Sequence, residues 1–403
     1  MPRPLQGRRK LGDDPARPRY IVNDPGVGYR LNGSGDRIIG WVRGKLQAGV
    51  LGVMVMFVSP GGPPPGAPAD TSGALVGFSF SSPVARAAGQ QPSAALHDLL
   101  WRLHPDLVRL PVYWSEVAPE PGVLDFTELD ALLGTIDHYN RTRPQHHTRV
   151  VLVAGARNLA TPELHLPAWM DTGETLDLET ATSSRAYFDY LEACFHRYWS
   201  NPLMFAWQIE NEPLDSTNDE LGDIALTPAA VAAEVVLLKS VDPVHPVVVT
   251  TFNSSTVALD RQATSRLRWL YDLLPGPRPA GHPALTLGLG DVLGLDLYVV
   301  TPSTPLDEAD VEERVAWKAE AINYWAAQAR KGSKQTWITE MQAAPWDGYP
   351  GFTPDDLALS AEAYSRTDVD VVLLWGVEYW LGDPTWMRAG REAMATIRGR
   401  GLG

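Results

Sequence analysis

The sequence has 403 residues, 44% of them hydrophobic, which is enough to bury one large core or two medium ones. Its formal net charge is −14 although the first 45 residues carry ten Lys and Arg against four Asp, so the rest of the chain is strongly acidic. An acidic surface argues against a nucleic-acid partner, because phosphate binding needs clustered positive charge. Cys194 is the only cysteine, which excludes an internal disulfide and a cysteine-based metal site.

The first 73 residues are expected to lie outside the main folded domain. Residues 1–45 are rich in Arg, Gly, Asp and Pro without an apolar period, which is typical of a disordered basic tail, or of a mis-assigned start if translation begins near Val42. The segment 46–73 contains the apolar run Leu46–Val58 and the small-residue site Ala67-Pro68-Ala69, as a secretory signal peptide and its linker do. We therefore expect a secreted or extracytoplasmic protein, with a membrane anchor through residues 38–58 as the alternative.

From Ala74 to the end, short β-branched or apolar runs alternate with longer helical patterns. This alternation predicts an α/β protein built as a single (β/α)8 TIM barrel over residues 74–403. A doubly wound open sheet is the rival, but no G-x-G-x-x-G follows the first strand and no phosphate-binding loop motif is present. The predicted strands are Leu75–Phe80, Leu107–Tyr113, Arg149–Gly155, Leu203–Ile209, Pro246–Thr251, Val292–Val299, Gln335–Glu340 and Asp370–Trp375. The predicted helices are Pro92–His104, Thr127–Asn140, Ser184–Trp199, Pro228–Val241, Asp260–Leu274, Asp307–Lys331, Thr353–Ser365 and Arg388–Arg398.

Two glutamates stand at the carboxyl ends of predicted strands, where a barrel places its chemistry. The fourth strand delivers Asn211-Glu212-Pro213, and the seventh ends on Glu340. Cleavage of a glycosidic bond needs one carboxylic acid to protonate the leaving oxygen and one carboxylate to stabilise the developing cation. Strands four and seven face each other across a barrel mouth, so this pair predicts a glycosidase site. The alternative is that each is an ordinary loop carboxylate.

These motifs resemble the clan of β/α-barrel glycoside hydrolases that includes families 1, 2, 5 and 42, and most of all the cellulase-like family 5. The resemblance covers roughly residues 74–398. It implies that Asn211 and Glu212 form the Asn-Glu pair whose glutamate is the general acid/base, that Glu340 is the nucleophile, and that the reaction retains anomeric configuration.

The resemblance also assigns supporting residues at other strand ends. Arg109, in the run Arg109–Trp114, would lie near the nucleophile, Tyr298 would hydrogen-bond it, and Trp375 would stack on a sugar. A salt-bridged structural arginine and a loop-capping Asn211 are the plain alternatives. Glu210 should point to the opposite side from Asn211, by strand alternation, and be structural.

Three further loop residues are candidates for substrate contact, namely Trp114, Trp346 and His165. Tryptophans in strand-end loops can stack on sugars, but a core position is an equal alternative, and His165 is as easily a hydrogen-bonded loop histidine. The sequence also departs from the family pattern. Asp296 stands where family 5 usually has a histidine, two residues before Tyr298, and Arg157 follows the third strand where a histidine is common. Residues 341–346 resemble family 42 as much as family 5.

The sequence therefore predicts a retaining β-glycoside hydrolase that acts on β-linked oligo- or polysaccharides. We expect a monomer with no metal and no organic cofactor. Two alternatives remain open: an exo-acting β-galactosidase-like or β-mannosidase-like enzyme with the same site, and a non-catalytic carbohydrate-binding barrel that has kept the aromatic residues and lost turnover.

Overall fold

The computed structural model describes residues 21–24, 28–31, 73–160, 163–170, 181–215, 226–252, 281–301, 310–346 and 351–399. The chain divides into two compact units, Met1–Gly62 and Pro63–Gly403. In the first unit, β1 (Ile21–Asp24) pairs antiparallel with β2 (Gly28–Leu31). These strands lie within the segment predicted as a tail, while the signal-like run lies outside the described residues. The boundaries proposed for tail, leader and barrel stay predictions.

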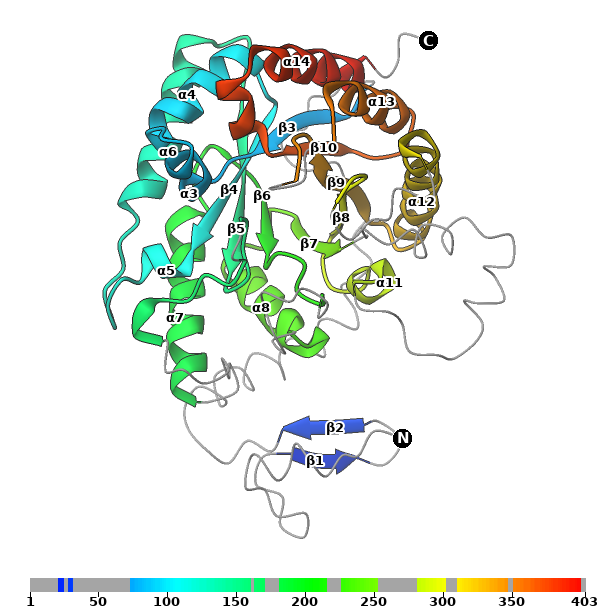
Figure 1. Cartoon of the computed structure of the whole chain (residues 1–403). Coiled ribbons are helices and arrows are strands. Elements are labelled where there is room, and N and C mark those ends of the chain that lie inside the picture. The colour runs from blue at the N-terminus through cyan, green and yellow to red at the C-terminus, as the bar shows by residue number, and fades with distance from the viewer. Residues whose placement is uncertain are drawn as a thin grey trace. The chain divides into compact units, whose positions relative to one another are not determined.

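The described part of the second unit is a closed barrel of eight parallel strands, as the sequence predicts (Figure 1). Its strand order is β10-β3-β4-β5-β6-β7-β8-β9, so neighbours in sequence are neighbours in space and the last strand closes on the first. The strands are β3 (Leu75–Ser79), β4 (Leu107–Tyr113), β5 (Arg149–Gly155), β6 (Met204–Ile209), β7 (Val247–Phe252), β8 (Val292–Leu297), β9 (Gln335–Gln342) and β10 (Val371–Trp375).

Helices surround this barrel on the outside (Figure 1). Several begin where the sequence places a cap: Thr227 accepts a hydrogen bond from Ala230 N, and Thr353 forms a capping box with Asp356. The predicted helix Asp260–Leu274 lies outside the described residues. The helices are α3 (Ser82–Ala87), α4 (Pro92–Leu103), α5 (Trp114–Val117), α6 (Thr127–Thr142), α7 (Ala181–Tyr198), α8 (Pro228–Val241), α11 (Pro283–Thr286), α12 (Val311–Lys331), α13 (Pro354–Ser365) and α14 (Pro384–Arg398), with 3-10 turns η1 (Ala168–Met170) and η3 (Val377–Gly382).

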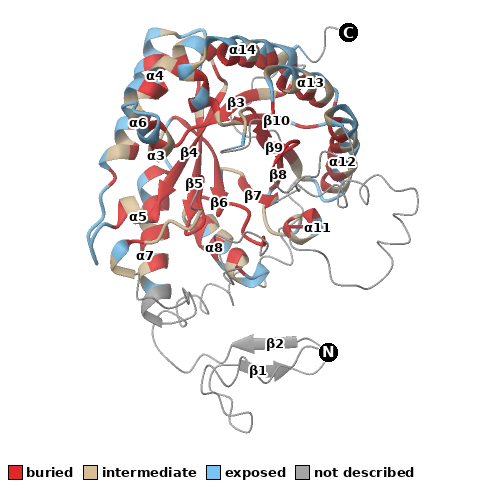
Figure 2. Ribbon diagram, viewed as in Figure 1, coloured by how far each residue is buried: buried red, intermediate tan, exposed pale blue. Residues whose placement is uncertain are grey.

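The strands are buried on both faces, because helices cover the outside and side chains fill the inside (Figure 2). On β4, alternate residues turn inward, from apolar Leu107 to charged Arg109 two positions later. Phe205 and Trp337 fill the interior near Leu107, with ring centroids 5.5 Å apart. The barrel is thus closed by an apolar plug toward its amino ends, and its polar side chains collect toward the carboxyl ends.

Two further features bear on the sequence predictions. Cys194 on α7 is a buried free thiol, as a core filler would be. Among the helices of the described ranges, none is long and apolar enough to cross a membrane.

Candidate active site

Glu212 lies in a tight turn that directly follows β6. Glu210 and Glu212 both have left-handed backbone conformations, with φ of 57° and 44°, which non-glycine residues rarely adopt. The side chain of Glu210 turns away from the mouth and accepts hydrogen bonds from the backbone of Ala156 and Arg157 and from the hydroxyl of Tyr187. Glu210 is therefore structural, as strand alternation predicts, and it binds the backbone of the loop after β5.

Only glycine at position 155 leaves room for this arrangement. A Cβ atom there would lie 2.4 Å from Glu210 Oε2 and 2.8 Å from its Cα, far inside contact distance. The end of β5 thus lets the turn after β6 fold closely against it. Burial raises the pKa of Glu210 to about 7 even though its three donors and the charge of Arg157 oppose that shift.

Arg157 fixes the other side of the Glu212 turn. Its guanidinium is fully buried, donates to the carbonyl oxygens of Glu212 and Asp215, and forms an ion pair with Glu163 at 2.8 Å. The amide N–H of Glu212 donates to Thr250 Oγ1 on β7 at 2.8 Å. The backbone of Glu212 is therefore held on both sides while its carboxyl group stays available at the mouth.

A β-bulge in β9 places Glu340. Against β8, Leu295 pairs with Ile338 but Asp296 pairs with Glu340, so Thr339 is the extra residue. The register against β10 shifts across the same residues. Thr339 and Glu340 therefore both direct their side chains to the barrel interior, Thr339 contacting Asp296 and Glu340 contacting Arg109. Bulges commonly re-aim side chains beside functional sites in this way.

The Glu340 carboxylate is bound by the two residues expected to contact it. Arg109 Nη1 donates to Oε1 at 2.9 Å, and the hydroxyl of Tyr298 donates to Oε2. Arg109 is completely buried, and its other donors reach Gln208 Oε1 at 2.8 Å and Asn211 Oδ1 at 2.7 Å. Four of the predicted residues, from β4, β6, β8 and β9, are thus joined in one hydrogen-bonded network.

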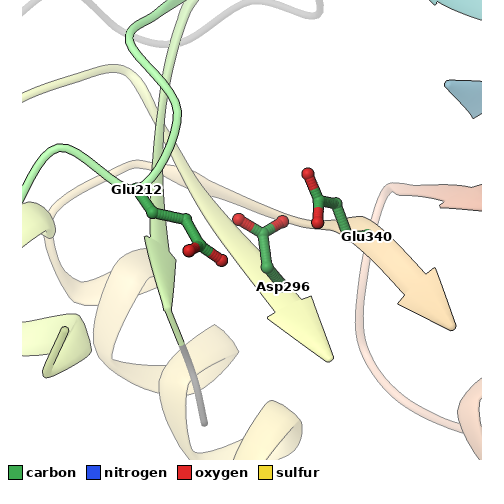
Figure 3. A group of neighbouring side chains, drawn as sticks. All are labelled: Glu212, Asp296 and Glu340. Carbon is green, nitrogen blue, oxygen red and sulfur yellow. The ribbon is translucent and has the colours of Figure 1, made fainter. Parts of the chain in front are cut away.

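A third carboxyl group, that of Asp296, lies between the two glutamates (Figure 3). One oxygen each from Glu212, Asp296 and Glu340 lie within 4.8 Å of one another, and all three residues are buried. Three carboxylates are suitable donors for a hard divalent cation. In the described contacts, both Glu340 oxygens also accept hydrogen bonds and Thr339 donates to Asp296.

Burial raises the pKa of Glu212 well above its usual value. The nearby carboxylates of Glu163, Asp296 and Glu340 raise it further, and Arg157 opposes them only in part. Burial and the charge of Glu340 likewise keep the Tyr298 hydroxyl protonated. Glu212 is thus set up to hold a proton, while Glu340 lies against a guanidinium.

The aromatic candidates separate into two groups. Trp346 is 41% exposed, and its ring lies edge-on to Tyr298 with centroids 5.2 Å apart. Trp375 ends β10 half-buried, and its register partner is Gln342, two residues after Glu340. Both remain candidates for contact with a sugar.

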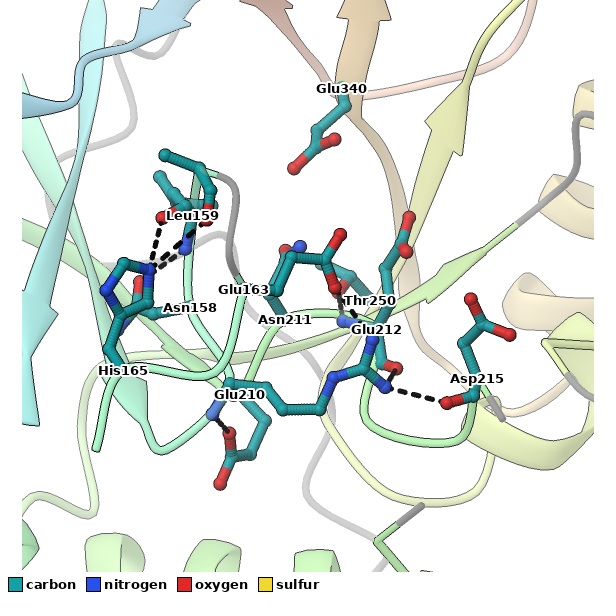
Figure 4. Close-up of polar contacts among 12 residues, drawn as sticks. Asn158, Leu159, Glu163, His165, Glu210, Asn211, Glu212, Asp215, Thr250 and Glu340 are labelled. Carbon is teal, nitrogen blue, oxygen red and sulfur yellow. Dashed lines mark hydrogen bonds and ion pairs between the residues drawn. The ribbon is translucent and has the colours of Figure 1, made fainter. Parts of the chain in front are cut away.

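The prediction of substrate contact is wrong for Trp114 in this structure. Trp114 is completely buried and is packed against Trp169, Tyr187 and Tyr190, because the loop after β5 and helix α7 cover it. His165 follows the plainer alternative. Its Nε2 contacts the carbonyl oxygens of Leu159 (Figure 4) and Ala160 at 2.9 and 3.2 Å. Its ring lies against that of Tyr113, with centroids 4.0 Å apart.

The site contains residues that the sequence analysis did not assign. Gln208 and Arg157 orient the predicted residues, and Asp296 enters the site itself. A signal for Asp296 was present, because residues two apart on a strand share a face and Tyr298 had been assigned to the mouth. No comparable signal pointed to Arg157, whose role depends on how two loops meet.

No protein-family model matches the sequence, and no curated protein sequence is similar to it. Solved structures do share its fold. They include GH5_18 from Streptomyces cattleya in complex with GlcNAc, at 15% identity and a TM-score of 0.58, covering 82% of this chain and 81% of that one. A GH5_18 variant from Bifidobacterium longum in complex with Manβ1-4GlcNAc has 14% identity and a TM-score of 0.55, over 80% and 78% of the chains.

The exo-β-1,4-mannosidase Op5Man5 from an Opitutaceae bacterium also has this fold, with 16% identity, a TM-score of 0.51, and coverage of 83% of this chain and 62% of that one. The chain therefore has the eight-stranded barrel fold of these glycoside hydrolases. At such identities the likeness extends to the fold alone.

Proposed function

We propose that the protein is a retaining β-glycoside hydrolase of the family 5 type. The observation that carries the proposal is the unequal environment of two carboxyl groups that face one another. Glu340 is bound by Arg109 and Tyr298, whereas Glu212 is buried among carboxylates that raise its pKa. A carboxyl group with a raised pKa that faces a second carboxyl bound by a guanidinium and a hydroxyl is the arrangement of an acid and a nucleophile.

The separation of the two groups supports retention of configuration. Retaining enzymes place their carboxyl groups about 5–5.5 Å apart, and inverting enzymes about 6.5–9.5 Å apart, to leave room for a water molecule. Oxygens of Glu212 and Glu340 lie within 4.8 Å, which favours direct attack on the sugar.

The proposed reaction has two steps. In the first, a Glu340 oxygen attacks the anomeric carbon while Glu212 donates its proton to the glycosidic oxygen, which leaves with the bonding electron pair. In the second, the Glu212 carboxylate removes a proton from water, and the water oxygen displaces Glu340 from the anomeric carbon. Both carboxyl groups return to their starting states.

The proposed substrates are β-linked oligo- or polysaccharides, with β-mannosides tested first. Structures of this fold include one in complex with Manβ1-4GlcNAc and one named an exo-β-1,4-mannosidase. Exposed Trp346 and half-buried Trp375 offer aromatic surface at the mouth for a sugar ring.

Two alanine variants test the assignment of roles. With a substrate whose leaving group is already acidic, Glu212→Ala should still form the glycosyl-enzyme and then accumulate it, because no base activates water. Azide should rescue this variant and give the β-azide. Azide should rescue Glu340→Ala by occupying the vacated space and give the α-azide.

NMR of the two azide products distinguishes the outcomes. The reverse pairing of products would exchange the roles of Glu212 and Glu340. Full activity in both variants would move the reaction elsewhere. Sugar binding without turnover by the wild-type protein, on a panel of aryl glucosides, mannosides, galactosides and xylosides, would favour the non-catalytic carbohydrate-binding barrel.

A further inference from the structure

Asp296 is a completely buried carboxyl group near the carboxyl end of β8, and it lies between Glu212 and Glu340 (Figure 3). Its Oδ1 atom accepts a hydrogen bond from Thr339 Oγ1 at 2.6 Å. Its Oδ2 atom is buried and has no hydrogen-bond partner within the described ranges. An ionised carboxylate accepts at two oxygens, so one donor leaves this group poorly solvated in its charged form.

Charged and polar groups from several strand ends surround Asp296. Arg109 on β4 acts on it, but Arg109 forms its ion pair with Glu340 at 2.9 Å. Glu212, after β6, and Glu340, on β9, bring negative charge, and Tyr298, directly after β8, donates to Glu340. From the loop after β5, Glu163 and Arg157 act on Glu212 with opposite signs.

Arg109 is paired with Glu340 and Arg157 with Glu163, so among the described residues Glu212 and Asp296 have no ion-pair partner. Burial, followed by the charge of Glu340, raises the pKa of Asp296 well above its usual value, and Arg109, Thr339 and Glu212 offset only part of that shift. A neutral Asp296 removes the like-charge contact with both glutamates. It also turns the unpartnered Oδ2 into an O–H donor, and one Glu212 carboxyl oxygen lies within 4.8 Å of an Asp296 oxygen as a possible acceptor.

We propose that Asp296 is a positioning residue that stays protonated through the reaction and donates a hydrogen bond from Oδ2 to the Glu212 carboxylate once Glu212 has given up its proton. The proposal rests on the proposed glycosidase function. The Glu212 carboxylate exists only between the two steps, when the glycosyl-enzyme awaits water. A donor aimed at it stabilises that state and makes Glu212 a stronger acid in the first step, without adding charge to the site.

The variants Asp296→Ala and Asp296→Asn separate this role from a merely structural one. Asp296→Ala removes the donor, so kcat/KM should fall roughly tenfold to a hundredfold and its alkaline limb should move to higher pH by about one unit. Asp296→Asn keeps a neutral side chain with an N–H donor and an oxygen for Thr339. It should recover most of the lost activity and keep its alkaline limb close to that of the wild type.

An ionised Asp296 predicts the opposite. Replacing it with Asn or Ala would then remove a negative charge beside Glu212, and the alkaline limb would move to lower pH in both variants. That result overturns the proposal. Thr339→Val is the matched control, because it removes the donor to Oδ1 and leaves Oδ2 and Glu212 in place. If Thr339→Val moved the limb as far upward as Asp296→Ala does, a general distortion would explain the shift, and the proposal would fail.

Infrared difference spectroscopy gives a readout that needs no turnover. At neutral pH the wild-type protein should show a carbonyl band of a buried protonated carboxyl group that is lost in Asp296→Asn and kept in Glu212→Gln. If that band is kept in Asp296→Asn, Asp296 is ionised and the inference is wrong, whatever the activity. If the band is assigned to Asp296 but the wild type neither turns over nor forms a glycosyl-enzyme, the proposed function fails separately.

Discussion

The hydroxyl of Tyr298 offers a quantitative test of the nucleophile, because it donates to one oxygen of Glu340 from a fully enclosed position. A hydrogen bond to a charged group contributes about 1.5–3 kcal/mol. In Tyr298→Phe the free carboxylate loses this bond, but so does the first transition state, in which Glu340 is already giving up charge. The loss in the free carboxylate is at least as large as that in the transition state and cancels it, so kcat/KM should not fall.

The second step lacks that cancellation. The glycosyl-enzyme ester carries no charge on Glu340, and the charge returns as the sugar leaves. With about half the charge developed, the second transition state loses roughly half of the bond, about 0.75–1.5 kcal/mol, or about fourfold to twelvefold in rate. On an aryl β-glycoside with a good leaving group, where the second step limits turnover, kcat should fall by this factor and the covalent intermediate should accumulate.

Pre-steady-state release of the aryl group measures both steps in one trace, as a burst followed by a slower steady rate. Tyr113→Phe is the control, since Tyr113 is equally buried but its hydroxyl bonds Ser81 Oγ at 2.9 Å and no carboxylate. It should leave the burst and the steady rate near those of the wild type. A fall in kcat/KM that exceeds the fall in kcat, or equal losses in the two Tyr variants, would refute the assignment of Glu340 as the group that departs in the second step.

Two other perturbations probe the mouth and the barrel closure. Trp346→Ala should raise KM and change kcat little, because its exposed ring lies beside Tyr298. Trp114→Ala should leave KM unchanged and lower the free energy of unfolding by about 3–5 kcal/mol, because Trp114 is completely buried. Michaelis kinetics and chemical denaturation of both variants test this, and a raised KM in Trp114→Ala would contradict the burial. Glu378 accepts from Ser81 N, and burial raises its pKa to about 7, so its folded form binds a proton more tightly than the unfolded chain does. Its contribution to stability is therefore complete below about pH 4.5 and is lost as the pH rises through 7. Glu378→Gln should reduce the loss of unfolding free energy between pH 5 and 8 by about 2–3 kcal/mol. Parallel curves of unfolding free energy against pH for wild type and variant would count against this.

The sequence was sufficient to predict the barrel because the signals for its strands are local. Each strand is a run of β-branched and apolar residues bounded by turn residues, and the ranges Leu107–Tyr113 and Arg149–Gly155 agree with β4 and β5 at both ends. The same reasoning predicted that Glu212 and Glu340 face each other, because strand order places strands four and seven on opposite sides of the barrel mouth. Contacts of Arg109 and Tyr298 with Glu340 are present as expected.

The parts that escaped prediction depend on contacts between loops and on local irregularities. Trp114 has the same sequence context as an exposed strand-end tryptophan, and only the packing of Trp169 and α7 over it decides its burial. The bulge at Thr339 breaks the period of two on which strand arguments rest. A regular strand with Thr339 facing inward would turn Glu340 outward, so its inward side chain is a property of register rather than of residue type.

The three carboxyl groups at the mouth show how backbone geometry makes chemically similar side chains different. The bulge brings Glu340 to Arg109 and Tyr298, so it receives two donors and the compensating positive charge. Asp296 receives one donor from Thr339, and the groups that act most strongly on Glu212 are burial and other carboxylates. Glu340 thus receives two donors and Asp296 one, and burial raises the pKa of both Asp296 and Glu212 well above its usual value. Because Arg109 binds Glu340 and also lowers the pKa of Asp296, its loss would affect more than one carboxyl group of the site.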